Sequence, residues 1–277
     1  MSGAIPGIIL KGLKANRRIY LTVSLGLLLI PFVTVYSQPG GHEFHTFQGA
    51  IVRGDTSVRS LALVFTGDSF ADGGSYIARV LASEEIKASF FLTGNFYRNP
   101  EFASIIRTLQ GEGHYLGAHS DRHLLYCDWA RRDSMLVTRQ QFRDDLLDNY
   151  RAMHNFGITS EDAPYFLPPF EWYNETISRW ACDMGLQLVN YSQGTLSHAD
   201  YTVPGEPGYL SSREIYESIL DYEASAFGGL NGFILLSHIG TAPERTDKFY
   251  QYLEELIREL KSRGYSFLRI DELLDRY

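Results

Sequence analysis

The sequence predicts an α/β protein whose parallel strands close into a barrel. From residue 61 onward, short apolar runs of strand length alternate with segments whose apolar residues recur at helical spacing. The run at 232–236 does not alternate between apolar and polar residues, as expected for a strand that is buried on both faces of a parallel sheet. Because the alternation of strand and helix is repeated many times, it favours a closed barrel over an open sheet.

The expected elements follow one another without an internal repeat. Strands are predicted at 61–65, 88–92, 115–118, 165–167, 186–191, 232–236 and 265–270, with helices around 77–81, 102–109, 142–153, 177–184, 215–219 and 246–260. Asn174 is expected to cap the helix at 177–184, and Gly157 to follow the helix at 142–153 in a left-handed conformation. Residues 38–59 are interpreted as a lead-in, and 60–277 as one α/β domain.

The amino-acid composition indicates which classes of partner the protein can bind. The chain of 277 residues has a formal net charge of −8, which argues against nucleic acid because phosphate binding needs a basic surface. Its 18 Tyr and 17 Phe suit hydroxylated ligands such as sugars, although aromatic residues also fill ordinary cores. The aromatic content alone does not decide between these two uses.

The first 37 residues predict export. Basic residues between Lys11 and Arg18 precede an apolar run at 19–35, the pattern of a signal peptide, with cleavage expected after Ser37. An uncleaved anchor is the alternative, because the run is close to the shortest that spans a membrane. The expected location is periplasmic or extracellular, with membrane contact only through this segment. Export would permit a disulfide between Cys127 and Cys182, but two free thiols are an equal alternative.

Residues able to bind a metal follow three of the predicted strands. Asp68 follows the first, His119 and His123 follow the strand at 115–118, and His238 follows the strand at 232–236. Two histidines four residues apart on a helical turn can converge on one ion. The carboxyl ends of barrel strands meet on one face, so these side chains are expected to share a site. One carboxylate and two imidazoles suit Zn²⁺ or another borderline divalent metal, which leaves His238 to protonate a leaving group.

These motifs, in this order, resemble the polysaccharide deacetylase family, whose shared unit is the NodB-homology domain of carbohydrate esterase family 4. The resemblance covers about 61–270 and rests on the acidic turn at 65–68, the segments at 88–94, 119–123 and 168–170, and the strand end at 235–238. It implies a distorted (β/α)7 barrel and a hydrolase that removes acetyl groups from N- or O-acetylated sugars. By this similarity Asp68, His119 and His123 bind the metal, with Zn²⁺ expected first and Co²⁺, Ni²⁺ or Mn²⁺ as alternatives, and His238 is the general acid.

Two departures from the family pattern affect the general base. The family has two adjacent aspartates after the first strand, where this chain has Thr66-Gly67-Asp68, and an arginine before the two prolines, where it has Leu167. A joint loss is physically coherent, because a buried arginine without its partner would be costly. Glu171 is the first candidate for a replacement base, Asp72 the second, and Asp68 itself the third.

The other residues expected at the site would orient His238 or contact the substrate. The resemblance assigns Asp200 the role of orienting His238. Aromatic side chains of the rim segments are expected to stack on sugar rings: Trp129, Phe170, Trp172 and Tyr173. Two other functions stay open, a catalytically impaired homologue that binds carbohydrate and a metal hydrolase of a non-sugar amide or ester.

Overall fold

The structure, a computed structural model, describes residues 34–37 and 43–274. The described residues belong to one compact unit. The signal-peptide prediction falls almost entirely on residues outside this description. No helix within the described ranges is long and apolar enough to cross a membrane.

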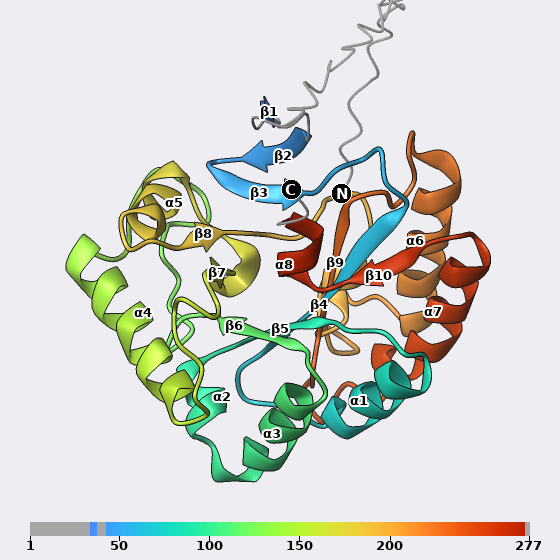
Figure 1. Ribbon diagram of the computed structural model, residues 1–277, viewed down its shortest axis with the longest axis horizontal. Coiled ribbons are helices and arrows are strands. Elements are labelled where there is room, and N and C mark those ends of the chain that lie inside the picture. The colour runs from blue at the N-terminus through green and yellow to red at the C-terminus, as the bar shows by residue number, and fades with distance from the viewer. Residues whose placement is uncertain (1–33, 38–42, 275–277) are drawn as a thin grey trace, which may run out of the picture. The chain divides into compact units, whose positions relative to one another are not determined.

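One mixed sheet curls around the core, with helices outside it (Figure 1). In sheet order its strands are β1 (Thr34–Ser37), β2 (Glu43–Phe47), β3 (Ala50–Arg53), β9 (Phe233–His238), β4 (Ser60–Gly67), β5 (Ser89–Leu92), β6 (Tyr115–Ala118), β7 (Tyr165–Phe166) and β8 (Gln187–Leu188), and β10 (Ser266–Leu268) pairs with β4. Strand pairs from β9 to β8 are parallel, as is the β10–β4 pair, whereas β1, β2 and β3 pair antiparallel. The predicted distorted (β/α) barrel is therefore confirmed.

β3 connects the two ends of the parallel sheet. Arg53 pairs with Phe233 of β9, and a bridge joins Ile51 to Val189 just after β8. The sequence pattern did not reveal this strand, because β3 has four residues, of which three are only half-buried. Part of the expected lead-in is thus a strand of the barrel.

Helices cover the outside of the strands in Figure 1. They are α1 (Gly74–Ser83), α2 (Gly94–Arg98), α3 (Ala103–Gly111), α4 (Arg139–His154), α5 (Glu175–Cys182), α6 (Ser212–Ser225) and α7 (Leu253–Ser262), with 3₁₀ turns η1 (Pro100–Phe102), η2 (Pro169–Glu171), η3 (Ser197–Ala199) and η4 (Phe249–Tyr252). The Asn174 side chain caps α5 by accepting the N–H of Ile177, and Gly157 has φ 75° after α4, as predicted. The last long helix begins later than predicted, because 249–252 form a 3₁₀ turn.

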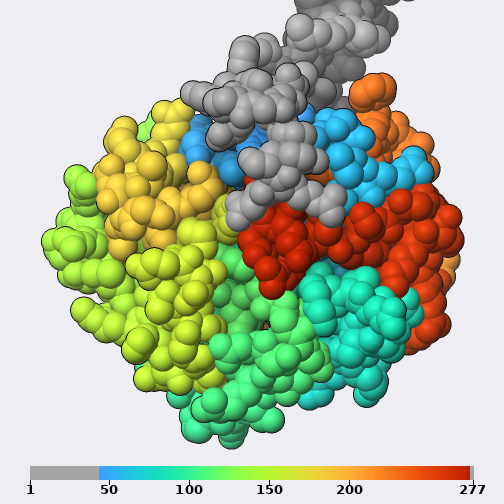
Figure 2. All heavy atoms as spheres, in the orientation of Figure 1, coloured from blue at the N-terminus to red at the C-terminus, as the bar shows by residue number. Residues whose placement is uncertain are grey.

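The short helix α8 (Ile270–Leu274) contacts β4, and Figure 2 shows it in red on the face of the molecule that is turned toward the viewer. Its first N–H, that of Ile270, donates to Ser89 Oγ (2.7 Å) at the start of β5. This helix was not predicted. It leaves the carboxyl-terminal ends of the strands, on the opposite side of the barrel, as the place for a site.

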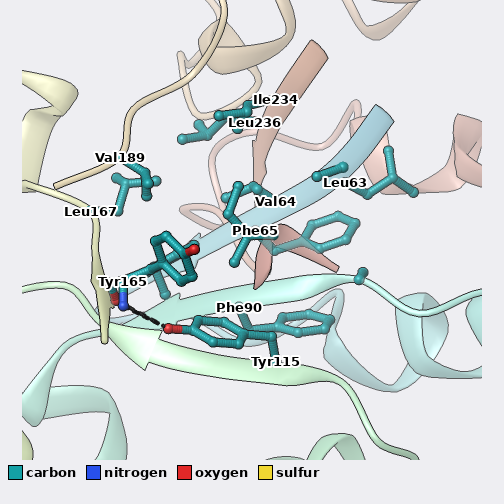
Figure 3. Packing of buried hydrophobic residues seen from close by; sticks show 14 of the residues in the cluster. Leu63, Val64, Phe65, Phe90, Tyr115, Tyr165, Leu167, Val189, Ile234 and Leu236 are labelled. Carbon is teal, nitrogen blue, oxygen red and sulfur yellow. Dashed lines mark hydrogen bonds between the residues drawn. The ribbon is translucent and has the colours of Figure 1, made fainter. Parts of the chain in front are cut away.

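Close packing inside the barrel fixes the strand ends (Figure 3). Every residue of β4 is buried, and the rings of Phe65 and Phe90 stack at 5.0 Å. The hydroxyl of Tyr115 accepts the N–H of Tyr165 (2.9 Å), which ties β6 to β7. Fully burying a side chain of this size stabilises the fold by about 1.5–3 kcal/mol. Cys127 is buried and Cys182 exposed, and both are free thiols.

Candidate active site

The segment 119–123 follows β6 as a bend, so the predicted helical turn is wrong. Ser120 and His123 have positive φ angles of 70° and 55°. The rings of His119 and His123 nevertheless lie side by side, with their centroids 5.1 Å apart. Left-handed backbone at two residues other than glycine costs about 1–3 kcal/mol each, so the surroundings must hold it in place.

Two polar side chains of α4 stabilise this bend. The Asp145 carboxylate accepts hydrogen bonds from the Ser120 hydroxyl (2.6 Å) and from the N–H groups of the next two residues (3.0 and 3.1 Å). Asn149 accepts the N–H of His119 (2.9 Å). Both are buried, and sequence reasoning missed them. The available signal was a pair of polar residues, one helical turn apart, among the apolar residues of this helix.

Both imidazoles of the bend favour the neutral form. Burial and the neighbouring imidazole hold the pKa of His119 well below its usual value, and burial lowers the pKa of His123 although Asp68 opposes this. His119 Nδ1 lies 2.8 Å from the carbonyl oxygen of Leu167, which is placed to accept its proton. In that tautomer Nε2 carries the lone pair that a metal requires.

Asp68, just after β4, is held as a carboxylate. One oxygen accepts from Thr93 Oγ1 (2.8 Å) and Asn95 Nδ2 (3.2 Å), and the other from Ser69 Oγ (2.7 Å). Burial raises the pKa of Asp68, but these hydrogen bonds, together with His123, lower it more. The net result is a pKa below the usual value, so the group is charged at neutral pH.

Asp68, His119 and His123 line one cavity of about 520 Å³. Within the described part of the chain, no three His, Cys, Asp or Glu side chains are already gathered so as to hold a metal ion. The chemistry of the three donors still fits a borderline divalent metal, because it combines a charged carboxylate with two neutral imidazoles. They are therefore the candidate ligands.

His238 lies at the end of β9 and is coupled to a buried carboxylate. Its Nδ1 is 2.6 Å from Asp200 Oδ1, and its backbone N–H donates to Oδ2 (2.9 Å). Burial lowers the pKa of His238, but Asp200 and then Glu171 raise it more, so the pKa lies above its usual value. The ring lines the same cavity, whereas Asp200 lies behind it and is 2% exposed.

Glu171 also faces this cavity, from the turn η2. It and Phe170 are consecutive residues with φ of 53° and 59°. The Asn190 side chain, which sequence reasoning missed, donates to the Glu171 carbonyl oxygen (2.9 Å). Burial raises the pKa of Glu171 to about 7, with Asp200 adding to the effect and His238 opposing it.

The structure separates Asp72 from this group. Its carboxylate forms an ion pair with Lys248 (2.9 Å) and accepts the N–H of Thr241 (2.8 Å). Asp72 therefore joins the β4–α1 loop to the loop after β9. Thr66, in register with His238, lines the cavity, and its buried Oγ1 has no hydrogen-bond partner in the structure.

Exposed aromatic side chains surround the cavity. Those that line it are Phe70 (41% exposed), Trp129 (55%), Phe170 (41%) and Tyr201 (53%). Trp172 packs against Trp129 with ring centroids 5.2 Å apart, one layer outside the lining. Tyr173 is buried, and its hydroxyl donates to the Phe47 carbonyl (3.0 Å), so its ring does not reach the cavity.

Comparisons with known proteins identify the family of this chain. A family model described as polysaccharide deacetylase matches residues 53–189. The peptidoglycan-N-acetylmuramic acid deacetylase PdaA of Bacillus subtilis is 23% identical over 225 residues, which cover 81% of this chain and 75% of the relative.

Two solved structures share the fold. A CE4 family pseudoenzyme from Bacillus anthracis superposes with a TM-score of 0.64 at 18% identity, over 83% of this chain and 70% of the other. A family 4 acetyl xylan esterase from Clostridium thermocellum, in complex with a cobalt ion, superposes with a TM-score of 0.58 at 23% identity, over 77% and 89%. The fold, the order of the motifs and the family match agree, and the chain is a divergent member of the polysaccharide deacetylase family.

Proposed function

We propose that this protein is a hydrolase that removes acetyl groups from an N- or O-acetylated polysaccharide or oligosaccharide. The observation that carries the proposal is one cavity lined by Asp68, His119, His123, Glu171 and His238. It combines two neutral imidazoles with a third whose pKa is raised, and with a carboxyl whose pKa is about 7. Such opposed shifts are typical of acid and base pairs.

Each residue has a chemical role. Glu171 accepts a proton from the water that attacks the acetyl carbonyl carbon. His238, held by Asp200, donates its proton to the departing nitrogen or oxygen as the bond to the acyl carbon breaks, and acetate is released. Asp68, His119 and His123 would hold a divalent cation, Zn²⁺ by first expectation, which polarises the carbonyl and acidifies water when bound.

The two pKa shifts predict a bell-shaped dependence of rate on pH. Glu171 must be deprotonated to act as base, so the rate rises as the pH passes about 7. His238 must be protonated to act as acid, so the rate falls once the pH exceeds its raised pKa. Because Glu171 and His238 interact, the apparent pKa values of the two limbs of the pH profile describe the pair and not either residue alone.

We infer that the activity takes place outside the cytoplasm, in the periplasm or beyond, after cleavage of residues 1–37. The support is the signal-like pattern of the amino terminus and the relative named as a peptidoglycan deacetylase. Residues 60–277, with β3, would then form the catalytic domain.

Acetate release tests the proposal. The full chain, supplied with Zn²⁺ or Co²⁺, is incubated with N-acetylglucosamine oligomers and with acetylated xylo-oligosaccharides. We expect Glu171→Gln to lower kcat by about 10²–10⁴-fold and Glu175→Gln, at an exposed position on α5, to leave it unchanged. Equal rates for Glu171→Gln and the unaltered protein would exclude the assigned base.

A second candidate is a carbohydrate-binding protein with little or no catalysis. It is favoured by the segment Thr66-Gly67-Asp68, which keeps only one of the two adjacent aspartates of the family pattern, and by Leu167, which stands where that pattern has an arginine. A neighbour of the same fold that is named a pseudoenzyme also favours it. Binding of the oligosaccharides without acetate release under either metal would support this function over the first.

A further inference from the structure

We propose that the rim of this cavity receives an uncharged glycan chain and discriminates against acidic ones. The inference rests on the proposed function, because it concerns the substrate of the same site. It is carried by two features of the described residues: aromatic rings beside both His123 and His238, and the absence of any Lys or Arg side chain from the cavity lining.

The first aromatic group adjoins the histidine bend. Phe170 contacts the His123 ring (4.3 Å between centroids) and the Trp129 ring (5.7 Å), and Trp172 supports Trp129 from outside. The indole N–H of Trp172 donates to the Asp128 carbonyl (3.2 Å), which fixes its plane. A supported ring that remains half-exposed is suited to stack on the apolar C–H face of a sugar ring.

The second group adjoins His238. Tyr201 lies 5.2 Å from the His238 ring, and Phe70 stands on the β4–α1 loop, where its backbone packs against Gly240. The cavity therefore has one set of rings beside His123 and another beside His238. A chain that crosses the cavity would have one sugar unit on each set while the acetylated unit occupies the middle.

The charges of the cavity oppose an acidic chain. Its charged carboxylate is Asp68, and the carboxyl of Glu171 is the other acidic group. The His238 ring, which favours the imidazolium, also lines the cavity, but it is already paired with the Asp200 carboxylate. Carboxylated sugars are normally bound by Arg or Lys, and carboxylates that face one another repel. A bound cation would reduce this repulsion only at the centre of the cavity, not at its rim.

Three basic side chains near the cavity have other partners. Lys248 pairs with Asp72 and donates to the Thr241 carbonyl (3.0 Å). Arg245 is fully buried and donates to carbonyl groups. Arg132 stacks on the outer ring, 3.5 Å from the Trp172 centroid. None of them lines the cavity.

Calorimetric binding to a matched pair of sugars tests the proposal. Cellohexaose and its derivative oxidised at C6 to carboxylates have the same length and linkage, and neither carries an acetyl group that could react. With the full chain, we expect the neutral hexamer to bind at least tenfold more tightly at low salt, with the difference shrinking as salt is added. Equal or tighter binding of the acidic hexamer, or no binding of the neutral one or of xylohexaose, would overturn the proposal.

Variants locate the binding surface. Trp129→Ala and Tyr201→Ala should each weaken binding of the neutral hexamer about tenfold. Phe227→Ala is the matched control, because Phe227 is fully exposed but precedes β9, at the opposite end of the strand from His238. If Trp129→Ala and Tyr201→Ala bind as well as Phe227→Ala, the rim is not the binding surface. Binding without acetate release contradicts the proposed function alone, whereas equal release from neutral and acidic acetylated chains contradicts this inference alone.

Discussion

The two histidines after β6 and the histidine at the end of β9 line the same cavity, but they favour opposite protonation states. His119 lies against a carbonyl group and a second imidazole, in surroundings that favour its neutral form. His238 lies against the buried carboxylate of Asp200, which favours the imidazolium. The residue type is the same, so the neighbours are what make His119 and His123 the candidate metal ligands and His238 the candidate proton donor.

The two regions are also supported differently. The bend at 119–123 depends on side chains of α4, whereas His238 belongs to a buried central strand and is oriented by one carboxylate. The first region should therefore be sensitive to changes in α4, and the second to changes at Asp200.

The largest effect should come from His119→Ala, which removes one of the neutral imidazoles. We expect bound Zn²⁺ to be lost and acetate release to fall to background, because two ligands hold a borderline metal poorly. Elemental analysis after dialysis, together with the acetate assay, measures both. His154→Ala, at an exposed histidine of α4, serves as the control. If His119→Ala keeps its bound metal and its rate of acetate release, the bend at 119–123 does not bind the metal and the two regions do not differ in the way proposed.

Asp200→Asn tests whether this carboxylate keeps His238 protonated. Without the carboxylate, burial dominates and the pKa of His238 falls, so the alkaline loss of activity should move to lower pH. We expect kcat to fall about 10²–10⁴-fold, with metal content unchanged. The pH profile is the decisive measurement, and Asp183→Asn on the surface is its control. An unshifted alkaline limb would contradict the role of Asp200.

Asp145→Asn tests the support of the histidine bend. The amide retains one acceptor oxygen but presents N–H groups toward buried donors, so about 1–3 kcal/mol of unfolding free energy should be lost. Metal affinity should fall about 10–100-fold, as for other groups that orient ligands. Urea denaturation and metal titration measure these effects. Asp144→Asn, exposed on the same helix, should change neither quantity.

The smallest effect is expected from Asn190→Ala. This change removes one hydrogen bond to the carbonyl of Glu171, and a bond worth about 0.5–1.5 kcal/mol corresponds to a two- to tenfold lower kcat. Full kinetics should show the change in kcat with little change in KM. A variant with unaltered kcat would mean that the left-handed turn at Glu171 is held by other contacts.

The fold could be predicted from the sequence because its signals are local. Apolar runs such as 61–65 and 232–236 mark buried strands, and residues such as Asn174 mark helix ends. β3 and α8 could not be predicted in this way. Both are short, and each is stabilised by partners far away in the chain.

The candidate site was predictable in composition but not in conformation. The chain order of Asp68, His119, His123 and His238 was sufficient to place all four at one cavity. The left-handed bend at 119–123 was not, because its cost is offset by side chains of α4 about 25–30 residues away. The burial of Tyr173 was equally hidden, because its partner is the carbonyl of Phe47.

The position of β3 has a consequence for where the chain can be shortened. A protein starting at residue 60 would lack this strand, leaving β9 and the segment after β8 with unpaired backbone groups. Such open edges recruit strands from other molecules. We therefore expect that version to aggregate, and the smallest soluble form to start ahead of Ala50.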